Sequence, residues 1–175
     1  MIFKQLKALR WPDLFTLLGL LCVSSSVYCS FKHSFIAAYI LLCAQFVLDY
    51  IDGKLARSIG GGALGIYLDS FSDFMSVCAS VVFGWFVGIE NIPMYIAGFL
   101  NIGAAAVRLS YFTVKKKRGS KDYTGIPTVL AAVVVASLVF LGYRFFNAYI
   151  QWFAILYFAS AIAMISDLRV KKILR

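Results

Sequence analysis

The sequence predicts an all-α protein that crosses a membrane with six helices and carries a short N-terminal helix in the membrane interface. Three observations support this prediction. Hydrophobic residues make up 62% of the chain and charged residues only 14%, whereas about a quarter of a soluble domain is charged. The apolar residues fall into six stretches close to membrane-spanning length. If each stretch crosses the membrane in turn, most of the basic residues between the stretches lie on the same side of the membrane.

We expect one domain over residues 1–175. Residues 1–12 mix basic and apolar side chains, which favours a helix lying in the interface. Residues 13–167 are expected to form a six-helix bundle, and residues 168–175 a basic cytoplasmic tail. The six apolar stretches are Leu14–Cys29, Ser34–Ile51, Ala63–Val87, Ile92–Val114, Pro127–Tyr143 and Ala148–Ile165.

The basic residues set the expected orientation. Of the 17 lysines and arginines, only Lys32 and Arg144 fall on one side, and the other 15 fall on the opposite side. The positive-inside rule makes the rich side cytoplasmic, with both termini there and the protein in the cell membrane. The basic residues that give the chain its net charge of +9 lie beside the apolar segments. This arrangement therefore indicates attraction to anionic membrane lipids, and we expect no nucleic-acid partner.

Four of the eight acidic residues gather at the expected cytoplasmic ends of the second and third stretches. Asp49 and Asp52 are three residues apart, so they share one helix face. Asp69 and Asp73 are four residues apart and do the same. Carboxylates placed in a membrane are costly and usually mark a functional site. Ligands that are all oxygen suit Mg²⁺ or Mn²⁺, which often bridge substrate phosphates.

The segment between the two acidic pairs has features that suit phosphate binding. Gly53 directly follows Asp52 and permits a close approach of backbone or phosphate. Arg57 can reach a phosphate through its planar fork. Gly65 lies one turn before Asp69, where a side chain could block the site. The order GxxxxGK[ST] is absent, so the segment is not a P-loop.

This part of the chain resembles the signature of the CDP-alcohol phosphotransferase family, D-x2-D-G-x2-A-R-x8-G-x3-D-x3-D. The eight fixed positions of that pattern occur here in order as Asp49, Asp52, Gly53, Ala56, Arg57, Gly65, Asp69 and Asp73. One spacing departs, because seven residues rather than eight separate Arg57 from Gly65. The difference falls in the glycine turn between the two acidic pairs.

The resemblance implies six transmembrane helices, a homodimer, and two divalent ions, Mg²⁺ or Mn²⁺, held by the four aspartates. It also implies that Asp73 is the general base that deprotonates the acceptor hydroxyl. Gly53, Ala56, Arg57 and Gly65 would line the nucleotide and diphosphate site. The implied reaction is a metal-assisted displacement that releases CMP from CDP-diacylglycerol or CDP-archaeol.

Three local features are similar to the phosphatidylserine synthase branch of this family, which implies L-serine as the acceptor. They are LDSFSD at 68–73, RLSYF at 108–112 and TGIP at 124–127. Two features depart, because MSV at 75–77 replaces the usual SFG and Tyr111 replaces an arginine. Arg108, with Lys121 or a neighbouring lysine, is expected to hold an anionic part of the acceptor. The same cations suit the phosphate of glycerol 3-phosphate, which remains the alternative acceptor.

The chain before the first span contains a weaker resemblance. Pro12-Asp13-Leu14-Phe15-Thr16 is similar to the P-N-x-x-T that precedes this span in many relatives. Two interpretations of Asp13 stay open: it contacts the nucleotide site, or it caps the first helix beside Pro12.

A cation transporter is the alternative of a different class, because carboxylates in a membrane would fit it too. It does not explain Gly53, Ala56 and Arg57 between the acidic pairs. It also does not explain why the carboxylates gather at one face, since only Glu90 lies on the other side. Metal-dependent release of CMP from a CDP-lipid would distinguish the two classes.

Overall fold

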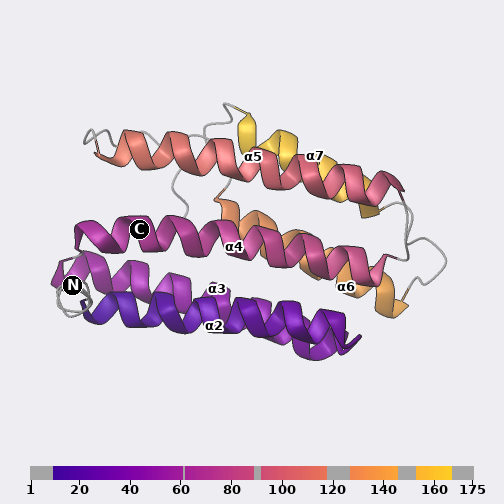
Figure 1. Cartoon of the computed structure of the whole chain (residues 1–175), viewed down its shortest axis with the longest axis horizontal. Helices are drawn as coiled ribbons and strands as arrows, with labels where there is room; N and C mark the ends of the chain where they lie inside the picture. The colour runs from indigo at the N-terminus through magenta and orange to yellow at the C-terminus, as the bar shows by residue number, and fades with distance from the viewer. Residues whose placement is uncertain (1–9, 61, 89–91, 118–126, 146–152, 167–175) are drawn as a thin grey trace.

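The computed structural model is a bundle of helices that run up and down along one long axis (Figure 1). It describes residues 10–60, 62–88, 92–117, 127–145 and 153–166. The described helices are α2 (Trp11–Phe31), α3 (Phe35–Ile59), α4 (Ala63–Val87), α5 (Ile92–Lys117), α6 (Thr128–Phe145) and α7 (Phe153–Ile165).

Five of the described helices, α2 to α6, are long and apolar enough to cross a membrane. Helix α7 is also apolar, with 13 residues described. The prediction of an all-α, multi-pass membrane protein is therefore confirmed for the described part of the chain. The first span begins at Trp11, which takes in the last two residues of the segment expected to lie in the interface. The rest of that segment, apart from Arg10, and the basic tail at 168–175 lie outside the described residues.

Helix α4 is the central element of the bundle. It contacts α2, α3, α5 and α6, and Figure 1 shows it between the α2–α3 pair and the α5–α7 pair. Helix α3 ends at Ile59 and is capped by Gly60, whose φ of 83° lies in the left-handed region that glycine adopts without strain. Helices α3 and α4 run antiparallel (Figure 1), so the end of α3 and the start of α4 lie at the same end of the bundle.

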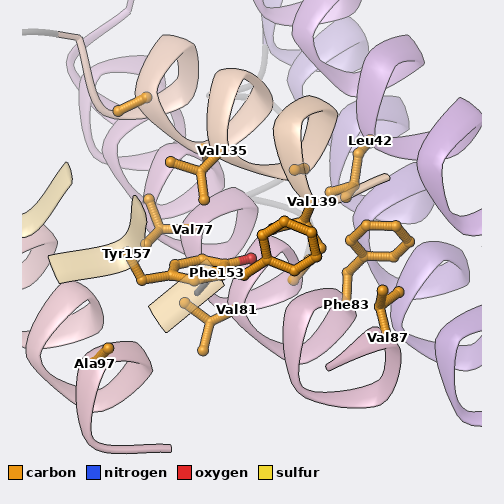
Figure 2. Close-up of a cluster of buried hydrophobic side chains, with 14 of the residues drawn as sticks. Leu42, Val77, Val81, Phe83, Val87, Ala97, Val135, Val139, Phe153 and Tyr157 are labelled. Atoms are coloured by element: carbon orange, nitrogen blue, oxygen red, sulfur yellow. The ribbon is translucent and has the colours of Figure 1, made fainter. Parts of the chain in front are cut away.

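The apolar core is centred on α4 and includes residues from all six described helices, and Figure 2 shows part of this cluster. Val81 and Val139 are fully buried, and Tyr157 is 1% exposed. Gly84 lets α7 approach closely, because a Cβ there would lie 2.5 Å from the Tyr157 hydroxyl oxygen. Small residues at such crossings are a common way to pack helices in membranes.

Buried polar groups tie the helices together within this core. The Tyr157 hydroxyl donates to the Ser80 carbonyl at 2.5 Å, and Asn101 Nδ2 donates to the Tyr157 carbonyl at 2.9 Å. These bonds join α4 and α5 to α7. Because a lipid environment offers no water to satisfy polar groups, such internal bonds keep buried donors paired. These hydrogen bonds stabilise the packing of α4 and α5 against α7.

Candidate metal and nucleotide site

Three of the four predicted aspartates meet at one end of the bundle. One carboxylate oxygen each from Asp49 on α3 and from Asp69 and Asp73 on α4 lie within 4.8 Å of one another. All three side chains are half-buried. Carboxylates this close repel one another unless a cation or a shared proton intervenes. The structure thus brings these three residues together, as their spacing along two neighbouring helices predicts.

The three carboxylates fit a divalent cation. A set of ligands made only of oxygen is the set that Mg²⁺ and Mn²⁺ prefer. Oδ1 of Asp73 is buried and has no hydrogen-bond partner among the described residues. Buried acceptors in proteins are nearly always paired. An oxygen of this kind, next to two further carboxylates, is therefore well placed to bind a cation.

Asp52, the fourth predicted aspartate, lies beside this cluster and is held differently. Its charge interacts with those of Asp49 and Asp69. Its side chain is only 4% exposed, and its Oδ2 accepts a hydrogen bond of 2.6 Å from the Thr16 hydroxyl. The four aspartates are therefore not equivalent: three form the cluster, and α2 fixes the fourth.

A cavity of about 430 Å³ opens beside the aspartates, between α2, α3 and α4. This volume falls in the range of sites for small ligands. The cavity is lined by Pro12, Asp13, Thr16, Asp52, Gly53, Ala56, Arg57, Gly62, Gly65, Ile66 and Asp69. All four residues expected at the nucleotide and diphosphate site are in this set, and Asp69 belongs to both the cavity and the carboxylate cluster.

The two glycines of the motif have different surroundings. A Cβ on Gly53 would meet no described atom within 4 Å, so nothing in the fold requires a glycine there. A Cβ on Gly65 would lie 2.5 Å from Oδ1 of Asp13. Gly65 therefore allows α2 and α4 to approach each other, whereas Gly53 leaves open space in the cavity.

Helix α2 contributes one wall of the cavity. The Asp13 carboxylate accepts the backbone N–H of Arg10 at 2.8 Å and also lines the cavity. Asp13 is not the N-cap of α2, because the helix begins two residues earlier and Arg10 is its N-cap. As the third helical residue, Asp13 stabilises the start of the helix through the bond to Arg10, and it also faces the cavity. The contact between Thr16 and Asp52 was not predicted. The signal in the sequence that singles out Thr16 is its match to the threonine of P-N-x-x-T, which by itself does not point to Asp52.

The predicted arginines occupy two places. Arg57 is exposed beside the cavity, and its Nε donates to the Gly53 carbonyl at 2.9 Å. Arg108, on α5, does not line this cavity, but its charge interacts with that of Asp73. Its Nε is buried without a hydrogen-bond partner among the described residues, and its guanidinium carbon lies 4.7 Å from the centre of the Phe112 ring. Lys121 lies outside the described residues.

A second cavity, of about 470 Å³, lies between α4 and α5. Its lining is mainly apolar and consists of Ser70, Phe71, Phe74, Ala106, Leu109, Ser110, Thr113 and Val114. The hydroxyls of Ser70 and Thr113 lie 2.9 Å apart and link the two helices. Within RLSYF, Leu109 and Ser110 therefore line this second cavity, whereas the charge of Arg108 interacts with that of Asp73 in the carboxylate cluster.

The chain is similar in sequence to known proteins. The sequence model of the CDP-alcohol phosphatidyltransferase family matches residues 9–165. A CDP-diacylglycerol–serine O-phosphatidyltransferase from Helicobacter pylori is 28% identical over 141 residues, which cover 77% of this chain and 59% of that protein. An archaetidylserine synthase from Methanothermobacter thermautotrophicus is 31% identical over 138 residues, which cover 75% of this chain and 58% of that protein. The chain thus spans less than two thirds of the length of these relatives.

Proposed function

Because the chain belongs to the CDP-alcohol phosphatidyltransferase family, we propose that it is a membrane transferase of phospholipid biosynthesis. In this proposal it transfers a phosphatidyl-type group from a CDP-linked lipid to the hydroxyl of a small alcohol and releases CMP. The observation that carries the proposal is the cavity that adjoins the carboxylate cluster, with Asp69 common to both. A diphosphate in this cavity would lie against cations held by the cluster.

The aspartates have the central roles. Asp49, Asp69 and Asp73, together with Asp52, would hold two divalent ions, Mg²⁺ or Mn²⁺. When bound, such ions neutralise the phosphate oxygens and stabilise the charge that develops during displacement. Asp73 takes the proton of the acceptor hydroxyl. The acceptor oxygen then bonds to the lipid-linked phosphorus, while the bond from that phosphorus to the bridging oxygen breaks and CMP leaves with the electron pair.

The cavity is proposed to hold the nucleotide end of the lipid. Gly53, Ala56 and Gly65 line it without large side chains, and its volume suits a ligand of nucleotide size. Arg57 is exposed beside it, where its planar fork can pair with phosphate oxygens. The lipid tail is proposed to be that of CDP-diacylglycerol or CDP-archaeol, since the names of the two relatives specify a diacylglycerol and an archaetidyl lipid.

The proposed acceptor is L-serine, because the names of both relatives contain serine. Arg108 supports this choice, because a guanidinium beside the site can bind a carboxylate through two parallel hydrogen bonds. Its charge interacts with that of Asp73, which places a cation next to the proposed base. Glycerol 3-phosphate is the alternative acceptor, since its phosphate would suit the same arginine.

We further propose that the protein is a homodimer in the cell membrane, in contact with anionic lipids. Both termini and the aspartate end of the bundle would face the cytoplasm. The distribution of lysine and arginine along the sequence supports this orientation. The cytoplasm is also where a soluble acceptor and a released nucleotide would be exchanged.

The direct test is an assay of the purified protein with a CDP-lipid and a panel of labelled acceptors: L-serine, glycerol 3-phosphate and inositol phosphate. We expect CMP and a labelled lipid to form with serine when Mg²⁺ or Mn²⁺ is present and not when EDTA removes the metal. Product from glycerol 3-phosphate alone would overturn serine as the acceptor. Cation transport without any release of CMP would overturn the transferase and favour the cation transporter.

A pair of variants tests whether the site is the one described. Asp73→Asn should lower the rate of CMP release by about 10²- to 10⁴-fold, the usual contribution of a general base. Glu90→Gln, which changes an acidic residue expected on the other side of the membrane, should leave the rate unchanged. Equal effects of the two changes would contradict the assignment of Asp73.

A further inference from the structure

The hydrogen bond between Thr16 and Asp52 connects α2 to the acidic residues of α3. Its donor and acceptor atoms are 2.6 Å apart. Thr16 is 5% exposed and Asp52 is 4% exposed, so water does not compete for this bond. The Thr16 hydroxyl also lies 3.5 Å from the Pro12 carbonyl. Because a hydroxyl has one hydrogen, the much shorter contact to the carboxylate identifies Asp52 as its acceptor.

This bond acts on the one predicted aspartate that lies outside the cluster of three. The charges of Asp49 and Asp69 interact with Asp52, and like charges at this range push a carboxylate away. A donor on a separate helix can hold the carboxylate against that repulsion and fix the direction of its oxygens. Both Thr16 and Asp52 line the cavity, so the bond lies in the wall of the site itself.

We propose that Thr16 is a positioning residue, which orients Asp52 for metal binding beside Asp49, Asp69 and Asp73. This inference rests on the proposed metal site and assigns a part of it to α2. Residues that hydrogen-bond to metal ligands typically change metal affinity by about 10- to 100-fold when they are replaced. Thr16 is not proposed to touch the metal or the reacting atoms.

The fold offers a matched control for the loss of this bond. Ser26 is fully buried on α2, and its hydroxyl donates to the Ala38 carbonyl of α3 at 2.8 Å. Ser26→Ala therefore removes a buried hydrogen bond between the same two helices, nearly three turns along α2 from Thr16. Thr16→Val removes only the hydroxyl and keeps the shape of the side chain. Thr16→Ser keeps the hydroxyl.

The test is a titration of each purified full-length variant with Mn²⁺ in detergent, followed by the electron paramagnetic resonance signal of the free ion and with no CDP-lipid present. Thr16→Val should weaken Mn²⁺ binding by about 10-fold or more. Thr16→Ser and Ser26→Ala should bind Mn²⁺ within about twofold of the wild-type protein. Melting curves of the same samples should show that Thr16→Val and Ser26→Ala are both folded and are destabilised to a similar extent.

Two results would overturn the positioning role. One is that Thr16→Val binds Mn²⁺ as tightly as Ser26→Ala does. If separate steady-state kinetics then showed a raised KM for CDP-lipid, Thr16 would act on the substrate and not on the metal site. The other is equal weakening by all three substitutions, which would trace the effect to general loosening of α2 against α3. A wild-type protein that binds no Mn²⁺ would instead overturn the proposed metal site, and this inference with it.

Discussion

Gly65 on α4 lies directly against Asp13 on α2, so that a Cβ on the glycine would be 2.5 Å from Oδ1 of the aspartate. The carboxylate is not free to move away, because its Oδ2 accepts the backbone N–H of Arg10 at 2.8 Å. Asp13 is also buried, with 3% of its surface exposed. This contact sets how closely α2 approaches α4 and therefore fixes the position of one cavity wall.

Gly65→Ala should consequently lower the melting temperature in detergent and raise the KM for CDP-lipid. The new methyl group would displace Asp13 from the start of α2, where loss of a capping interaction costs about 0.5–2 kcal/mol. In an Asp13→Ala background the same change should be neutral or stabilising, because alanine is a better helix former than glycine by about 1 kcal/mol. Melting curves of the four proteins of this double-mutant cycle provide the measurement. The same loss in both backgrounds would contradict the contact.

Gly53→Ala should have the opposite pattern, with the fold preserved and substrate binding impaired. A Cβ at this position meets no described atom within 4 Å but enters the cavity that Gly53 lines. We expect the melting temperature to hold or rise, since alanine favours the helix by about 1 kcal/mol. The KM for CDP-lipid should rise by about 10-fold, as expected if roughly 1.4 kcal/mol of binding is lost.

Gly103→Ala is the control for this substitution. Gly103 is also a helical glycine, it is exposed on α5, and a Cβ there likewise meets no described atom within 4 Å. It does not line the cavity. Steady-state kinetics should therefore show an unchanged KM for Gly103→Ala. If both alanines altered the KM equally, the cavity would not be the nucleotide site.

The carboxylate cluster could be predicted from the sequence because helical spacing determines most of it. Residues four apart, such as Asp69 and Asp73, differ in direction by about 40° around a helix axis, so they face the same neighbour. Residues three apart differ by about 60°, which helps explain why Asp52 turns toward α2 while Asp49 faces the cluster. The Thr16–Asp52 contact was beyond prediction, since it depends on how α2 packs against α3.

The end of α3 shows that a helix can extend beyond its apolar stretch. The second apolar stretch ends near Ile51, but α3 continues to Ile59. Hydropathy marks where apolar residues stop, whereas lysine, arginine, alanine and leucine continue a helix readily. The glycine at position 60, in the left-handed region, ends it. Gly53, Ala56 and Arg57 therefore lie on a rigid helix rather than in a loop, which fixes their positions around the cavity.

Arg108→Gln should raise the KM for the acceptor by about 10-fold or more and leave the KM for CDP-lipid nearly unchanged. The guanidinium is buried at Nε and its charge interacts with that of Asp73, so it is placed to bind an anionic group beside the proposed base. A hydrogen bond to a charged group contributes about 1.5–3 kcal/mol. Initial rates measured against each substrate separate the two constants.

Arg144→Gln is the control for this charge change, because Arg144 is exposed in the last turn of α6. It is expected on the side of the membrane away from the aspartates, so both KM values should stay at their wild-type level. A rise in the KM for CDP-lipid alone after Arg108→Gln would assign the arginine to the nucleotide and not to the acceptor.

Gln45→Leu should leave the melting temperature unchanged or raise it, although Gln45 is almost completely buried. The side chain is 1% exposed, and both its Nε2 and its Oε1 lack hydrogen-bond partners among the described residues. Leaving a buried polar group unpaired costs about 1–3 kcal/mol, so an apolar side chain of similar size should be tolerated.

Asn101→Leu is the matched comparison, since Asn101 is 2% exposed but its Nδ2 donates to the Tyr157 carbonyl at 2.9 Å. That change removes a bond that joins α5 to α7, and such bonds in membrane proteins contribute about 0.6 kcal/mol on average. Melting curves in one detergent should therefore move in different directions for the two leucines. A larger loss for Gln45→Leu than for Asn101→Leu would show that Gln45 has a stabilising partner.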